Sequence, residues 1–169
     1  MHCWRITKYN PQYRDENGFY QKDDWTSISD VGKAYKGAVL TFDTYIRYEN
    51  AYVDAIIQIM NANSTESLQV ETLEKNSYFH CADLPGLQLR LCYDSLREDL
   101  LLSTRDIQLV SRLALRNIIW CKLYGKQMFV HFGYDYYMYI GSKNRAASEV
   151  SAIEKAGLFV EDMTSPYSA

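Results

Sequence analysis

The amino-acid sequence predicts a single α+β domain, spanning residues 1–169, with a largely antiparallel central sheet and about three main helices. Three observations support this fold class. The chain has 169 residues, of which 47% are hydrophobic and 23% are charged, as in one ordinary globular domain. Two long segments carry apolar residues at helical spacing. The last third consists of short alternating segments separated by turn residues, as in consecutive antiparallel strands.

The first elements expected are a strand and an exposed hairpin. Residues 3–8 alternate well enough for a strand, and Pro11 ends it. Asn17-Gly18 lies between aromatic residues and is a strong hairpin-turn signal. We therefore expect an irregular, solvated hairpin here. Its acidic residues are Asp15, Glu16, Asp23 and Asp24.

Two helices are expected next. Ser29 or Asp30 is a suitable cap for a short helix that runs through Tyr35 and stops at Gly37. Thr41 is a good N-cap for the clearest helix of the chain. This second helix is expected to end at the polar run 61–64. Its apolar positions are Phe42, Tyr45, Ile46, Tyr52, Val53, Ile56, Ile57 and Met60.

Glu49 lies on the apolar stripe of this helix, between Ile46 and Val53. The expected arrangement is a partly solvated carboxylate at the edge of the stripe, because an unpaired buried carboxylate is costly. The alternative is a buried acid that is paired with a cation.

The middle of the chain predicts two strands and a helix. Residues 68–73 and 87–93 alternate like strands, with a loop over 76–86. Ser103 or Thr104 opens the helix. Its apolar positions are Ile107, Val110, Leu113, Ala114 and Ile118, and its positions expected to face solvent are Arg105, Gln108, Arg112 and Arg116.

The last third predicts antiparallel strands and one more helix. The expected strands are 120–124, 127–133, 136–141 and 158–163, with turns at 125–126 and 133–135. The helix lies within residues 142–157, with Ser142 or Asn144 as its cap and Gly157 at its end. Pro166 is expected to end the ordered part of the chain.

Charge and hydropathy predict a cytoplasmic protein. The chain begins without a basic and apolar leader, and its apolar runs are far shorter than the ~20 residues of a spanning helix. Its four cysteines, Cys3, Cys81, Cys92 and Cys121, are therefore expected to be reduced thiols. A net charge of −3 argues against direct binding of nucleic acid and is compatible with a basic protein partner.

The sequence predicts no catalytic residue, metal or cofactor. His131 lies in an apolar predicted strand, where a structural role is the ordinary one, and nothing in the spacing brings it to His80. The dipeptides His2-Cys3 and His80-Cys81 contain zinc-ligand types, but adjacent strand residues point to opposite faces. Phosphate-cradling loops and nucleophile elbows are absent from the sequence.

Four segments are similar to those of a family of small bacterial proteins. They are residues 4–11 (WRITKYNP), 25–32 (WTSISDVG), 129–141 (FVHFGYDYYMYIG), and the ending GLFV at 157–160 with SPY at 165–167. The resemblance covers most of the chain outside residues 62–100. The family is that of immunity proteins of polymorphic toxin systems, including contact-dependent growth inhibition.

The resemblance implies a protein that covers the active site of a cognate toxin, such as an EndoU-like RNase, and performs no catalysis itself. Acidic pairs suit a basic cleft, and tyrosines supply rigid contact area. The pairs are Asp15-Glu16, Asp23-Asp24, Glu98-Asp99 and Glu161-Asp162, and all are expected to be exposed. The candidate partner-binding residues are Asp15, Glu16, Asp23, Asp24, Tyr134, Asp135 and Tyr137.

Two alternatives stay open at this point. One is a small metal-independent RNase that uses His80 and His131. The other is a ligand-binding module with Glu49 at the floor of an apolar pocket. The tract 133–141 is expected to form a strand with cross-strand aromatic packing on one face and a recognition surface on the other.

Overall fold

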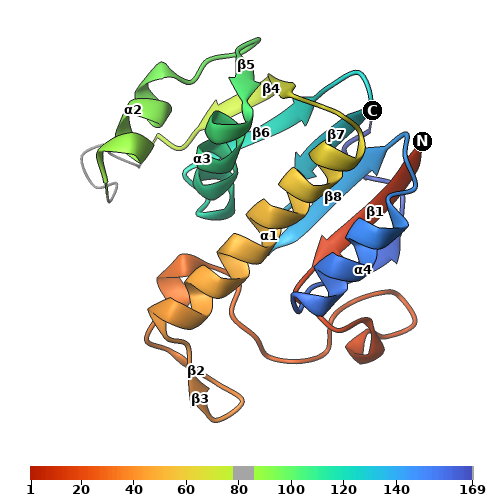
Figure 1. The fold of residues 1–169 in the computed structure, drawn as a ribbon. Helices are drawn as coiled ribbons and strands as arrows, with labels where there is room; N and C mark the ends of the chain where they lie inside the picture. The colour runs from red at the N-terminus through yellow and green to blue at the C-terminus, as the bar shows by residue number, and fades with distance from the viewer. Residues whose placement is uncertain (78–85, 169) are drawn as a thin grey trace.

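The structure is a computed structural model that describes residues 1–77 and 86–168. Among these residues, seven strands form one sheet in the order β5-β4-β6-β7-β8-β1-β9 (Figure 1). Every neighbouring pair in this sheet is antiparallel, which confirms the predicted α+β class. The strands are β1 (His2–Thr7), β4 (Ser67–Lys75), β5 (Leu101–Ser103), β6 (Ile119–Tyr124), β7 (Met128–Phe132), β8 (Tyr137–Ser142) and β9 (Phe159–Asp162).

Four helices accompany the sheet in the described part of the chain. They are α1 (Phe42–Ala62), α2 (Leu87–Ser95), α3 (Thr104–Leu115) and α4 (Ala147–Lys155). Figure 1 shows α1 lying diagonally in front of the sheet, with α3 and α4 on the same side. The strand β1 lies between β8 and β9, so the two ends of the chain meet in the sheet.

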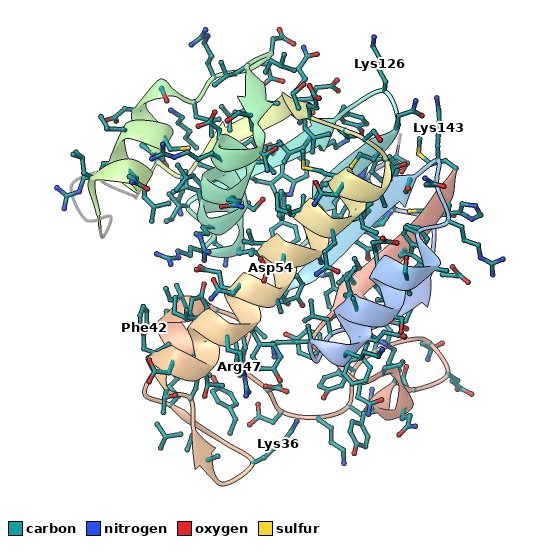
Figure 2. All side chains as sticks on the ribbon, in the orientation of Figure 1. Lys36, Phe42, Arg47, Asp54, Lys126 and Lys143 are labelled. Carbon is teal, nitrogen blue, oxygen red and sulfur yellow. The ribbon has the colours of Figure 1, made fainter. Side chains whose placement is uncertain are left out.

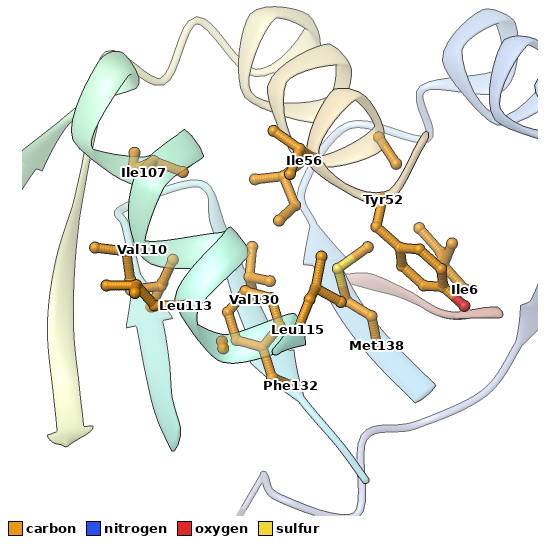
Figure 3. Packing of buried hydrophobic residues seen from close by; sticks show 14 of the residues in the cluster. Ile6, Tyr52, Ile56, Ile107, Val110, Leu113, Leu115, Val130, Phe132 and Met138 are labelled. Atoms are coloured by element: carbon orange, nitrogen blue, oxygen red, sulfur yellow. The ribbon is translucent and has the colours of Figure 1, made fainter. Parts of the chain in front are cut away.

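The core lies between this helical layer and the sheet. Tyr52 and Ile56 of α1 are fully buried and face Ile6, Val130 and Met138 of the strands (Figure 3). Alternate residues of a strand point to opposite faces, so the residues between these core positions lie on the sheet's other face, away from the helices. This second face is called the open face below.

The caps of the two longest helices are as the sequence predicts. The Thr41 hydroxyl accepts a hydrogen bond from the backbone N–H of Thr44 at the start of α1. The Ser103 hydroxyl accepts one from the N–H of Asp106 at the start of α3. Each side chain satisfies a backbone donor that has no partner within its helix.

The helix predicted from Ser29 or Asp30 to Tyr35 is wrong. A single 3-10 turn, Ile28–Asp30, is followed by a small hairpin of β2 (Ala34–Tyr35) and β3 (Ala38–Val39). Lys36 and Gly37 both have positive φ, which is the two-residue turn that suits a hairpin. The turn chemistry of Lys36-Gly37 therefore decides the structure of this segment.

The strand predicted over 87–93 is also wrong, because these residues begin α2. The leucines alternate in the sequence, but the buried positions are Leu89, Cys92 and Leu96, at helical spacing. Leu87 and Leu91 are exposed. The alternation is thus a coincidence within an amphipathic helix.

The end of the chain departs from expectation in two places. The helix begins at Ala147 rather than near Ser142, because Ser142 is the last residue of β8 and its hydroxyl is bonded to Asn63 and Asn144. Gly157, with φ of 96°, ends the helix region as predicted. Order does not stop at Pro166, since the Tyr167 ring packs against Trp120 and its carbonyl accepts a hydrogen bond from Lys122.

No helix in residues 1–77 and 86–168 has both the length and the apolar character that crossing a membrane requires.

Candidate functional site

Three of the seven predicted contact residues lie on the turn between β7 and β8. The Tyr137 N–H donates to the Tyr134 carbonyl at 3.1 Å, and the Gly133 N–H donates to the Tyr137 carbonyl at 2.6 Å. Asp135 and Tyr136 have φ of 54° and 62°. Residues 134–137 therefore form a tight β-turn whose two central residues are not glycine. Tyr134 is 73% exposed at its corner.

Tyr136 anchors this turn in the protein interior. Its ring is buried beside Trp25, with centroids 4.9 Å apart, and its hydroxyl donates to the Tyr45 hydroxyl at 3.0 Å. A non-glycine residue with positive φ costs about 1 kcal/mol, and burial of the Tyr136 ring offsets that cost. The turn is therefore held rigidly, while Tyr134 and Asp135 on the same turn face solvent.

The chain of hydrogen bonds continues from Tyr45 to Glu49, which is completely buried. Arg116 donates to both oxygens of Glu49, at 2.6 and 2.8 Å, and Arg112 donates to one, at 2.7 Å. Burial raises the pKa of Glu49, but the two arginines outweigh burial and hold it below its ordinary value.

This geometry corrects two sequence expectations. Glu49 is the buried, cation-paired acid rather than a solvated one, and Arg112 and Arg116 face α1 rather than solvent alone. A carboxylate offers about four acceptor sites, and Tyr45 and the two arginines provide four donors. Glu49 thus ties α1 to α3, and its oxygens are fully used by protein groups.

The remaining candidate residues lie in the irregular segment between β1 and the β2–β3 hairpin. Lys8 anchors the start of this segment. Its side chain is only 2% exposed, and its ammonium lies 4.1 Å from the ring centroids of both Tyr9 and Trp25. Burial lowers the pKa of Lys8 to about 8, although Asp24, 3.1 Å away, opposes the shift.

The acidic residues of this segment play different roles. Asp24 is not a free surface acid, because it pairs with Lys8 and, at 3.2 Å, with Lys36 at the tip of the β2–β3 hairpin (Figure 2). Asp15 folds its own hairpin by accepting from the N–H groups of Asn17 and Phe19. Both expected surface carboxylates are therefore engaged in internal contacts.

Three other carboxylates of the predicted set point to solvent. Glu16, Asp23 and Asp135 are exposed and have no hydrogen-bond or ion-pair partner among the described residues. Exposed aromatic rings accompany them, since Phe19 is 69% and Tyr13 is 43% exposed. Neither ring is among the contact residues predicted from the sequence, although the Asn17-Gly18 turn signal beside Phe19 indicates an exposed hairpin.

The other two acidic pairs are also partly internal. Glu98 accepts hydrogen bonds from the backbone N–H groups of Thr72 and Leu73, on the part of β4 that β5 does not cover. Glu161 forms ion pairs with Arg5 and Arg14. Glu98 is exposed as expected, whereas Glu161 is half-buried, so the expectation that all four pairs are exposed is wrong for Glu161.

Two contacts bring the irregular segment and the turn together. Arg14 donates to the Tyr137 hydroxyl at 2.9 Å. The buried Tyr52 hydroxyl accepts from the Lys8 N–H at 2.7 Å and donates to the Tyr136 carbonyl at 2.6 Å. The two segments thus share a common base. Their exposed acidic and aromatic residues, together called the acidic–aromatic surface below, are Tyr13, Glu16, Phe19, Asp23, Tyr134 and Asp135.

His131 lies on the open face and is completely buried. Its Nδ1 lies 2.8 Å from the Ser165 hydroxyl, and its Nε2 lies 2.8 Å from the Tyr124 hydroxyl. Burial and then Lys122 lower the pKa of His131 to about 4. Both ring nitrogens are occupied, which does not favour a general base. His80, the other half of the RNase hypothesis, lies outside the described residues.

The cysteines and zinc-ligand types show no clustering where the structure describes them. Cys3, Cys92 and Cys121 are free thiols, and Cys81 lies outside the described residues. In residues 1–77 and 86–168, no group of three or more His, Cys, Asp or Glu side chains is arranged to hold a metal ion.

Comparison of the chain with protein-family models, with curated proteins and with solved structures finds no match in any of the three.

Proposed function

We propose that this chain is a cytoplasmic immunity protein that binds a cognate bacterial toxin, a nuclease such as an EndoU-like RNase, and covers its active site. The observation that carries the proposal is the acidic–aromatic surface, where unpaired carboxylates and exposed rings stand on a rigid base. The resemblance of residues 4–11, 25–32 and 129–141 to immunity proteins implies the same class of function.

Charge supports a basic partner. Glu16, Asp23 and Asp135 are exposed and form no ion pair or side-chain hydrogen bond with the described residues, which leaves them accessible to a partner. The active site of a nuclease must attract phosphate and is therefore basic. Complementary charges accelerate association and exclude partners of the wrong sign. We therefore expect binding to weaken as salt rises.

Rigidity supports tight binding. Exposed tyrosine and phenylalanine rings are the residue types that dominate interface energies. Tyr134 stands on a turn that Tyr136 fixes in the core, and Phe19 stands on a hairpin that Asp15 fixes. Little conformational entropy is lost when such pre-arranged groups bind a partner.

The first experiment is co-purification of the chain with the product of the gene immediately upstream, together with a growth assay while that product is expressed. A stable complex and rescued growth support the proposal. Absence of both would overturn it.

A matched pair of variants tests the surface itself. Glu16→Gln/Asp23→Asn/Asp135→Asn should weaken the complex by roughly tenfold or more at low salt, and less at high salt. Asp54→Asn/Asp94→Asn/Glu154→Gln removes the same number of exposed charges elsewhere and should leave the affinity unchanged. Equal affinity of both variants would remove this surface from the interface.

A further inference from the structure

The last described residues of the chain, 163–168, lie across the open face of the sheet. The Met163 N–H donates to the Cys3 carbonyl of β1 at 3.1 Å. Further along, Ser165 is buried against His131 of β7. The Tyr167 carbonyl accepts from the Lys122 ammonium of β6 at 2.8 Å. This segment, called the strap below, therefore crosses several strands without joining the sheet as a strand itself.

The face under the strap is a single row of side chains. Arg5, Tyr139, His131 and Lys122 are direct cross-strand neighbours on β1, β8, β7 and β6, so they share one face of the sheet. The Tyr167 ring meets Trp120, His131 and Tyr139 edge-on, at centroid distances of 5.9, 6.4 and 5.9 Å. The strap thus keeps His131 out of water.

The strap also reaches the turn that carries Tyr134 and Asp135. The Tyr167 hydroxyl lies beside Gly133, the residue just before the turn. A Cβ atom on Gly133 would lie 3.3 Å from the same hydroxyl. Tyr136 fixes the turn from the helical side, and Tyr167 therefore contacts it from the opposite face of the sheet.

We propose that the strap positions the acidic–aromatic surface, with Tyr167 acting as a positioning residue that holds the turn at residues 133–137 in its binding conformation. This inference rests on the proposed function for its effect on affinity. Its structural part, the dependence of the turn on the strap, stands without a partner.

The test uses two variants of the full chain. Ser165→Ala/Tyr167→Ala removes the hydroxyl at His131 and the ring that packs on the open face. Tyr134→Ala removes only the exposed ring on the turn. Three quantities are measured for each: the proton NMR titration of His131, amide exchange of residues 133–137, and affinity for the product of the adjacent upstream gene.

Release of the strap exposes His131, so its titration midpoint in Ser165→Ala/Tyr167→Ala should rise from about 4 toward the ordinary 6.5. Amide exchange in the turn should become at least about tenfold faster, and affinity should fall at least about tenfold. Tyr134→Ala should lower affinity while leaving the His131 titration and the amide exchange as in the wild type.

Three results separate the two proposals. A shifted His131 titration with unchanged exchange in the turn would overturn the positioning role. An unshifted His131 titration in Ser165→Ala/Tyr167→Ala would also overturn the positioning role, because the contacts of Ser165 and Tyr167 would then not hold the strap in place. The third result is faster amide exchange of the turn in Ser165→Ala/Tyr167→Ala, together with no binding of the upstream gene product by the wild type. This result would support the role of the strap and refute the immunity function.

Discussion

The Arg14 guanidinium donates a hydrogen bond to the Tyr137 hydroxyl, 2.9 Å away and 123 positions further along the chain. The same guanidinium lies 3.4 Å from Glu161 of β9, and its side chain is 7% exposed. One buried cation therefore links the irregular amino-terminal segment to the turn and to the edge of the sheet.

Arg14→Met should lower the free energy of unfolding by about 1–3 kcal/mol, because the Tyr137 hydroxyl loses a charged partner in a half-buried site. Glu161 keeps its contacts with Arg5, which limits the loss. Urea denaturation measures the change. Arg97→Met, at an exposed position, is the control and should change stability by less than about 0.5 kcal/mol. An equal effect of both substitutions would contradict the linking role of Arg14.

Glu49→Gln should destabilise the fold by about 3–5 kcal/mol, because Arg112 and Arg116 lose the anion that they share. The direction in which the stability contribution of Glu49 changes with pH follows from its depressed pKa. Its contribution is complete above the ordinary value of 4.5 and is lost as pH falls below it. Urea unfolding at pH 7 and pH 3.5 should show a smaller difference between wild type and Glu49→Gln at the lower pH. Glu154→Gln, at an exposed site, should show no difference at either pH.

Because of the buried His131, the protein should lose stability at mildly acidic pH. Its pKa is about 4 in the folded protein and 6.5 ordinarily, so between these values the unfolded chain binds a proton that the folded chain refuses. Stability from this group therefore falls as pH drops from 6.5 to 4, by up to about 3 kcal/mol. Thermal unfolding of His131→Gln should show a flatter pH dependence in this range. His2→Gln, at an exposed histidine, should keep the wild-type slope.

The buried Lys8 should give a pH dependence of the same sign in the alkaline range. Its pKa of about 8 lies below the ordinary 10.5, so the unfolded chain holds the extra proton between these values and stability rises with pH. The difference in unfolding free energy between wild type and Lys8→Met should shift by about 2 kcal/mol in favour of the wild type from pH 8 to pH 10. Lys126→Met, at an exposed lysine, serves as the control. A constant difference for Lys8→Met would mean that Lys8 titrates normally.

The elements that the sequence predicts correctly are those that local residues determine. The helix after Thr41 has its own cap and stripe, and the strands at 120–124, 127–133 and 136–141 are joined by short turns. The strand prediction for residues 87–93 fails because the leucines fit both the two-residue period of a strand and the spacing of a helix. Only the packing of Leu89 against the core distinguishes the two structures.

The site was predictable to a smaller degree, because its charges are neutralised over long distances in sequence. Glu49 meets Arg116 across 67 positions, and Asp24 meets a lysine at the end of the first strand. Neither pairing has a local signal. The exposed carboxylates Glu16, Asp23 and Asp135 were identified from composition alone, which cannot separate them from Asp24.

The position of β1 between β8 and β9 has a consequence for synthesis on the ribosome. Residues 2–7 leave the ribosome long before their partners, residues 137–142 and 159–162. The strand β1 must wait unpaired until β8 has been made, and its pairing closes a very long loop. The sheet is thus completed only once β9 has left the ribosomal tunnel, whereas the β6–β7–β8 meander can form earlier.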